Sequence, residues 1–170
     1  MRKVKFFTKF ISVGMLCLTL ETLGIQVAQA QRPVFLLDLT CVDRDGDYRR
    51  NSRDISVGRE IYTSVMSINP HSAFTCKLPT ANSASLRLEY GMSDTHSNSA
   101  PVTITAYLDG NEVASKTAAP GKTGTLLVDI SKGKSLAIET ACARASNCGS
   151  PVYFFKAQIE PAAASPGRRQ

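Results

Sequence analysis

Short runs in which apolar and polar residues alternate recur along this chain from Val34 onward. In the clearest run, residues 102–108, Val102, Ile104 and Ala106 alternate with Thr103, Thr105 and Tyr107. A period of two places successive side chains on opposite faces of a strand. Residues 85–90, 126–130, 136–138 and 153–159 repeat the pattern, and no apolar stripe at helical spacing runs over ten or more positions. The alternation therefore predicts an all-β sandwich.

The same pattern gives expectations for individual segments. The apolar run Val34–Leu39 is expected to open the domain as a strand, and Asp109-Gly110 to form a two-residue hairpin turn. In the last run, Tyr153, Phe155, Ala157 and Ile159 are expected on one face, with Phe154 on the other. The charged segment Asp43–Asp54 reads as a surface loop, and residues 161–170 as a disordered tail.

The first thirty residues are typical of a secretory signal peptide. Four basic residues precede an apolar core from Phe10 to Leu20, and Ala28-Gln29-Ala30 offers small residues to a signal peptidase. The core is shorter than the roughly 20 apolar residues that span a bilayer. We therefore expect residues 1–30 to be removed, residues 31–160 to form one domain, and the protein to be secreted or periplasmic without a membrane span.

Removal of the leader changes the charge of the chain. The leader holds four of the 20 basic residues and one of the 14 acidic residues, which leaves 16 and 13, a net charge of +3. The remaining arginines between Arg44 and Arg59 are interleaved with carboxylates. Because nucleic-acid binding needs a clustered basic face, we expect no nucleic-acid partner.

Four cysteines follow the leader, and an even number in an exported chain predicts disulfides. Four cysteines allow three pairings. We favour Cys142 with Cys148, which closes a short loop, and Cys41 with Cys76. Metal ligation is the alternative, but neither pair has the Cys-x-x-Cys spacing of a zinc site.

The order of these signals resembles the NPCBM-like carbohydrate-binding modules appended to some glycoside hydrolases. The segments that carry the resemblance lie within residues 34–160 and are Val34–Leu39, Val57–Tyr62, Asn69–Leu78, Leu88–Asp94, Val102–Val113 and Leu126–Ile138. The resemblance implies a galactose-binding-like jelly-roll β-sandwich of about eight strands that binds glycans without catalysis.

Glycan sites usually contain an aromatic ring against the C–H face of the sugar, surrounded by hydrogen-bonding groups. The chain has no tryptophan, so tyrosines are the candidate rings. Tyr90 and Tyr153 lie on apolar faces and are expected in the core. The candidate ligand-binding residues are therefore Tyr107, which alternates outward, with Tyr48, Tyr62 and Asp94.

Asp43, Asp45 and Asp47 place carboxylates at alternate positions, a spacing that can supply oxygen ligands to calcium. The glycine and glutamate positions of an EF-hand loop are not matched. Calcium here and a solvated turn stay open alternatives, and no other cofactor is expected.

No catalytic motif stands out. His71 and Ser72 adjoin each other, but no Gly-x-Ser-x-Gly elbow is present, and we expect a structural, hydrogen-bonding role for His71. The sequence thus favours a non-enzymatic module that binds a polysaccharide or cell-envelope glycan. The alternative is a structural β-sandwich without a sugar site that binds another envelope protein.

Overall fold

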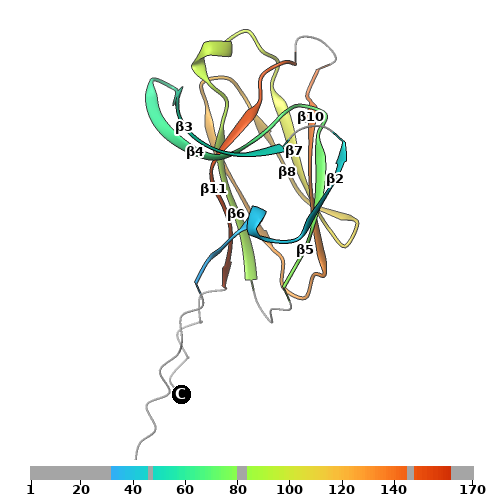
Figure 1. Cartoon of the computed structure of the whole chain (residues 1–170). Helices are drawn as coiled ribbons and strands as arrows, with labels where there is room; N and C mark the ends of the chain where they lie inside the picture. Colours follow the sequence, from blue (N-terminus) through green and yellow to red (C-terminus); the bar gives the residue numbers. More distant parts are fainter. Residues whose placement is uncertain (1–31, 46–47, 80–83, 145–147, 162–170) are drawn as a thin grey trace, which may run out of the picture. The chain divides into compact units, whose positions relative to one another are not determined.

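Two antiparallel sheets face each other across one apolar interior (Figure 1). The computed structural model describes residues 32–45, 48–79, 84–144 and 148–161. In these ranges the only helical elements are two short 3-10 turns, η1 (Leu36–Asp38) and η2 (Asp94–His96). The predicted all-β sandwich is confirmed. No helix in these ranges is long and apolar enough to cross a membrane.

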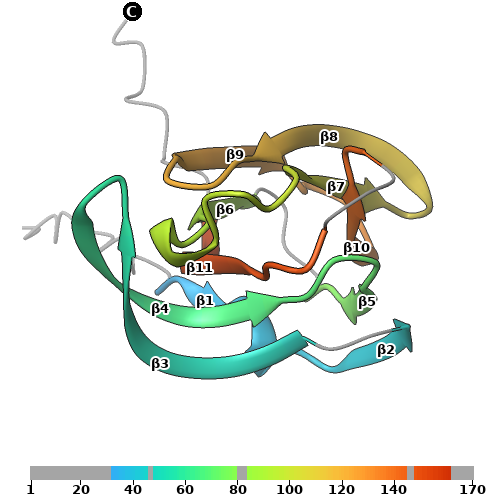
Figure 2. The same ribbon diagram turned by 90° about the horizontal axis from the view of Figure 1, so that it is seen from above.

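The first sheet has the strand order β3-β4-β11-β6-β9, with β1 paired to β11, and the second has the order β2-β5-β10-β7-β8. Figure 2 shows the two layers from above, with β8 and β9 side by side where the sheets meet. The strands are β1 (Val34–Phe35), β2 (Cys41–Asp45), β3 (Tyr48–Val57), β4 (Glu60–Ile68), β5 (Ala73–Lys77), β6 (Ala84–Gly91), β7 (Val102–Leu108), β8 (Asn111–Ala118), β9 (Thr123–Asp129), β10 (Ser135–Cys142) and β11 (Val152–Pro161).

The period-two pattern places the core as predicted in the central strands. On β7, Val102, Ile104 and Ala106 are fully buried, and on β6 the Leu86, Leu88 and Tyr90 side chains point inward. Asp109 and Gly110, both at positive φ, form the expected turn between β7 and β8. The hydrophobic interior between the sheets is therefore built by alternate residues of neighbouring strands.

The predicted faces of β11 are wrong over its first half. A β-bulge between Phe154 and Lys156 shifts the register against β6. Phe154 is fully buried in the main core, whereas Tyr153 and Phe155 contact a second apolar cluster with residues of β3. One extra residue in a strand reverses the face of every side chain before it, which a strict alternation cannot foresee.

Two expectations near the start of the domain are also corrected. The segment Asp43–Asp54 is not a loop, because β2 and β3 contain all of its described residues. Both are edge strands, where charged side chains are common because they block pairing with other chains. Of the run Val34–Leu39, only β1 is strand, and η1 follows it. The leader and residues 162–170 lie outside the described residues.

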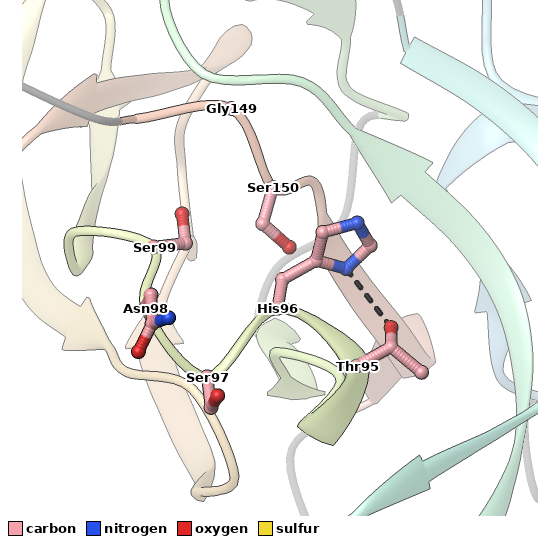
Figure 3. A pocket seen from close by; sticks show the side chains of 7 residues that line it. All are labelled: Thr95, His96, Ser97, Asn98, Ser99, Gly149 and Ser150. Atoms are coloured by element: carbon pink, nitrogen blue, oxygen red, sulfur yellow. Dashed lines mark hydrogen bonds between the residues drawn. The ribbon is translucent and has the colours of Figure 1, made fainter.

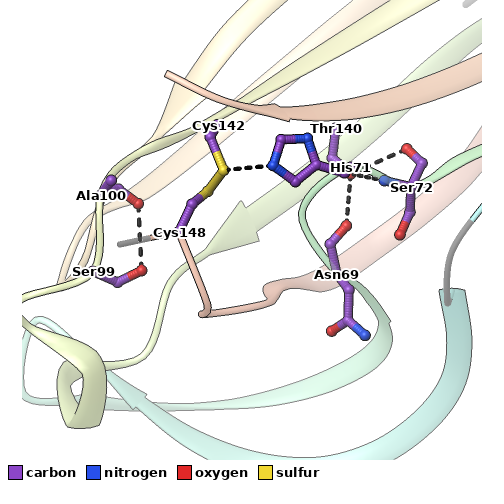
Figure 4. Close-up of a disulfide and its surroundings, with 8 residues drawn as sticks. All are labelled: Asn69, His71, Ser72, Ser99, Ala100, Thr140, Cys142 and Cys148. Carbon is purple, nitrogen blue, oxygen red and sulfur yellow. Dashed lines mark hydrogen bonds between the residues drawn. A yellow bond between two sulfur atoms is a disulfide. The ribbon is translucent and has the colours of Figure 1, made fainter. Parts of the chain in front are cut away.

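Both expected disulfides are present. Cys41 and Cys76 are register partners that join β2 to β5, and Cys142 at the end of β10 bonds to Cys148. His71 lies against the second disulfide, with Nε2 3.0 Å from the Cys142 sulfur (Figure 4). The imidazole thus has the structural contact that the sequence predicted, although its partner is a sulfur atom.

Candidate functional site

Several loops gather at one end of the sandwich, which we call the loop end. They are the β6–β7 connection with η2, the β3–β4 turn, the β8–β9 connection, and the segment that leads into β11 (Figures 1 and 2). At the β3–β4 turn, Gly58 has φ +62°, and a Cβ there would lie 3.1 Å from the carbonyl oxygen of Gly121. Glycine therefore lets the β3–β4 turn approach the β8–β9 connection closely.

Asp94 holds η2 against the β3–β4 turn. Its carboxylate accepts hydrogen bonds from the Ser56 hydroxyl at 2.6 Å and from the backbone N–H groups of Gly58 and Arg59 at 2.8 and 2.9 Å. These bonds, the one from Ser56 most of all, lower the pKa of Asp94 below its ordinary value. Both carboxylate oxygens are thus engaged within the protein, and Asp94 positions the loop that follows it.

A polar pocket of about 320 Å³ lies beside η2, and we call it the loop-end pocket (Figure 3). The residues that line it are Thr95, His96, Ser97, Asn98, Ser99, Gly149 and Ser150. His96 Nδ1 lies 3.0 Å from the Thr95 hydroxyl, which fixes the imidazole ring and leaves Nε2 for another partner. Hydroxyl, amide and imidazole groups of this kind match the alternating donors and acceptors of a sugar.

Ser150 is the most informative residue of the loop-end pocket. Its side chain is 1% exposed, and its hydroxyl has no hydrogen-bond partner among the described residues. Figure 3 shows the side chain pointing into the space beside the His96 ring. A buried hydroxyl without a partner costs about 1–3 kcal/mol, so native proteins keep few of them without a functional reason.

The predicted ligand-binding residues are not brought together. Tyr107 lies half-buried on the outer face of β7, and Tyr48 packs on Phe74 with ring centroids 4.4 Å apart. Tyr62 stacks on Phe155 at 4.5 Å, and its hydroxyl donates to Glu60, a bond that raises the pKa of Tyr62. None of these three tyrosines lines the loop-end pocket, and neither does Asp94, which lines a separate pocket with Gly58 and Arg59.

Both tyrosines that were expected to be buried are buried, although Tyr153 lies on the opposite face of β11 from the one predicted. Tyr90 and Tyr153 are each 3% exposed. Tyr90 packs beside Phe154 in the main core, whereas Tyr153 belongs to the second apolar cluster.

The calcium prediction at Asp43, Asp45 and Asp47 stays a prediction. Asp43 and Asp45 belong to β2, and Asp47 lies outside the described residues. Within the described ranges, no three His, Cys, Asp or Glu side chains come together as metal ligands do.

Sequence reasoning missed the residues that line the loop-end pocket. His96 was an unassigned loop residue, and neither Asn98 nor Ser150 was singled out. The usable signal was the cluster Thr95–Ser99 after the acidic turn, since five polar residues in a row exceed what a short connection needs. Ser150 gave no signal, because its burial depends on the fold.

Comparison with known proteins places this geometry in a structural class. No protein-family model and no curated protein matches the sequence. A CBM51 module of Clostridium perfringens ZmpB, solved with an INT domain, matches with a TM-score of 0.63 and 14% identity, over 78% of this chain and 32% of that one. The CBM51 of C. perfringens GH95, solved with methyl-galactose, matches with a TM-score of 0.62 and 14% identity, over 75% of this chain and 99% of that one.

Tandem CBM51 modules of Sp3GH98 from Streptococcus pneumoniae match with a TM-score of 0.61 and 13% identity, over 76% of this chain and 47% of that one. The sandwich has the CBM51 fold. The carbohydrate-binding-module jelly roll that the sequence resembled is thereby confirmed as the fold of this chain. This chain spans about a third of the ZmpB chain and almost all of the GH95 CBM51.

Proposed function

We propose that this chain is an exported, non-catalytic glycan-binding module whose ligand occupies the loop-end pocket. The Ser150 hydroxyl carries the proposal, because it has no partner among the described residues and rotation about its Cα–Cβ bond would present it to a sugar hydroxyl in the pocket. Solved proteins with the CBM51 fold support the ligand class, since one was solved with methyl-galactose and another with GlcNAc.

A second function has one observation in its favour. No aromatic ring other than the His96 imidazole lines the loop-end pocket, and the chain contains no tryptophan. Glycan sites usually use such a ring. The second candidate is therefore a β-sandwich that binds another envelope protein and has no sugar site.

The experiment is a glycan array with the purified protein, followed by calorimetry on the best ligand with Ser150→Ala. We expect this variant to bind about tenfold more weakly, because it loses one hydrogen bond that forms in a buried site. We expect its unfolding midpoint to stay the same or rise, because the hydroxyl has no partner within the protein.

The matched control is Ser131→Ala. Ser131 is half-buried, its hydroxyl accepts a hydrogen bond from the Ala84 N–H at 3.1 Å, and it does not line the loop-end pocket. This variant should lose stability and keep its affinity. Retention of no glycan by the wild type, together with capture of a specific envelope protein, would favour the second function. If the wild type and Ser150→Ala bound the ligand with equal affinity, this would show that the ligand does not occupy the loop-end pocket.

A further inference from the structure

A second pocket, of about 210 Å³, lies on the other side of the segment that leads into β11. We call it the arginine pocket. It is lined by Arg49, Asn51, Arg53, Ser67, Asn69, Pro151 and Tyr153. Among the described residues, this lining contains two guanidinium groups and no carboxylate. Arg49 has another interaction, so the positive charge that favours an anion here is that of Arg53.

The Arg53 guanidinium is held in place by Tyr153 and forms no ion pair with a described carboxylate. It lies over the Tyr153 ring, 4.8 Å from the centroid, and donates a hydrogen bond to the Tyr153 hydroxyl. Tyr153 is itself buried, so it is a rigid support. Among the described residues, no carboxylate forms an ion pair with Arg53. A fixed guanidinium fork is well suited to bind a carboxylate or sulfate through paired N–H groups.

Asn51 is held in the same way. Its amide nitrogen donates to the Ser67 hydroxyl at 2.7 Å, and its amide oxygen accepts from Ser64 at 2.6 Å. Arg49, Asn51 and Arg53 line the pocket together across a β-bulge, which shifts the register of β3 against β4 between Arg50 and Arg53. The arginine pocket is thus built on a bulged edge strand, where hydrogen bonds hold the side chains of Asn51 and Arg53.

The arginine pocket and the loop-end pocket are lined by consecutive residues. Ser150 belongs to the loop-end pocket and Pro151 to the arginine pocket. Neighbouring Cα atoms along a chain are about 3.8 Å apart, so the two linings meet at the Ser150–Pro151 peptide bond. One oligosaccharide can therefore reach both.

We propose that the arginine pocket binds the oxyanion of an acidic sugar, so that the ligand of this module is an acidic glycan. This inference rests on the proposed function, because it places the neutral part of the same ligand in the loop-end pocket. The carboxylate of a uronate or sialate and the sulfate of a sulfated sugar share the required chemistry, and the experiment distinguishes them.

The test is an array that carries galacturonate-, sialate- and sulfate-bearing oligosaccharides, each printed beside the same oligosaccharide with its acid group esterified or removed. We expect the acidic member of at least one pair to be retained much more strongly than its neutral partner. The acid group of that pair identifies the source of the oxyanion.

Calorimetry on that pair then uses Arg53→Gln, Arg53→Lys and Arg49→Gln. We expect Arg53→Gln to weaken binding of the acidic member by about tenfold or more and to leave the neutral member unchanged, because charge-assisted hydrogen bonds are stronger than neutral ones. Arg53→Lys keeps the charge without the fork and should lose less. Arg49 already has another interaction, so Arg49→Gln should weaken binding of the acidic member less than Arg53→Gln does.

The matched control is Lys116→Gln, which removes one positive charge from the exposed face of β8 and should change neither affinity. Unfolding midpoints show whether each variant is folded. Equal retention of acidic and neutral members would overturn this inference and leave the proposed function standing. If Arg53→Gln weakened binding of the acidic and the neutral oligosaccharide equally, this would also overturn the inference. Arg53 would then affect binding through its contact with Tyr153. Retention of no glycan at all would overturn both proposals.

Discussion

Ser150 and Asp94 lie in neighbouring parts of the loop end and differ in how their polar atoms are satisfied. The Asp94 carboxylate accepts three hydrogen bonds from the β3–β4 hairpin, whereas the buried Ser150 hydroxyl has no partner in the described ranges. Hydrogen bonds within the protein stabilise the fold, and an unpaired buried group raises the free energy of the unliganded state. Asp94 is thus suited to support the site and Ser150 to bind a ligand.

The role of Asp94 gives a pH-dependent prediction for Asp94→Asn. Because the folded-state pKa of Asp94 is below its ordinary value of 3.8, its contribution to stability is complete above that value and is lost as the pH falls through the lowered pKa. We expect the variant to unfold at a lower temperature than the wild type at about pH 7, and the difference to vanish near about pH 2.

Thermal unfolding followed by circular dichroism measures this difference. Asp54→Asn is the control, because this exposed carboxylate of β3 accepts a single side-chain bond from Thr63. A difference between wild type and Asp94→Asn that persists unchanged at the lowest pH would show that the amide disturbs the turn by its shape and not by its lost charge.

At this scale, sequence reasoning succeeded where the residue type decides the role. The four cysteines after the leader form two disulfides, and Tyr90 and Tyr153 are buried. It failed for Ser150 and His96, because serine and histidine occur in most surface loops. Only the folded chain shows which of them is buried beside a pocket.

The edge strands β2 and β3 show what local propensity misses at the scale of elements. Aspartate and arginine are depleted in strands, so the charged segment looked like a loop. Both strands lie at sheet edges, where one side faces solvent and charge is tolerated. The same error hid the arginine pocket, because Arg49, Asn51 and Arg53 are brought together only by a bulged strand.

The two disulfides should act on different properties. The Cys41–Cys76 bond closes the longer loop, with a sequence separation of 35 against 6 for Cys142–Cys148. In the chain-entropy model, the double serine variants lose about 4 and about 2.4 kcal/mol of stability, respectively. We also expect the Cys142–Cys148 variant to lose ligand affinity, because Gly149 and Ser150 follow Cys148 directly.

Urea unfolding gives the two stabilities, and calorimetry with the best array ligand gives the affinities. Each double variant serves as the control for the other. Mass mapping of the unreduced protein should show the four cysteines oxidised in these two pairs. Free thiols in the exported protein, or the larger stability loss in the Cys142–Cys148 variant, would contradict this assignment.

At the scale of the whole molecule, the sandwich could be predicted from alternation and the jelly-roll class from resemblance. Both rest on the central strands, which form one contiguous core. The arrangement of the loops could not be predicted, because it depends on contacts between distant segments, such as Asp94 with Gly58. The site therefore followed from the fold and not from any motif.

The proposed export gives a prediction for residues 1–31. Protein recovered from the periplasm or the medium should have an intact mass that corresponds to a start at Gln31, because Ala28-Gln29-Ala30 presents small residues to the signal peptidase. Ala30→Asp is the matched variant, in which processing should stop. Exported protein that still carries residues 1–30 would contradict cleavage at this position.

The first and last strands of the described sandwich are neighbours, since Val34 pairs with Ile159. Cα atoms of paired antiparallel strands are about 5 Å apart, so a brief linker could join these two points. A circular permutant with this linker could have its new termini in another loop. The domain could also be inserted into an exposed loop of a host protein. In Figure 1, both strand ends lie at the foot of the sandwich, away from η2. A reporter attached there would leave the binding loops free for use as a sensor.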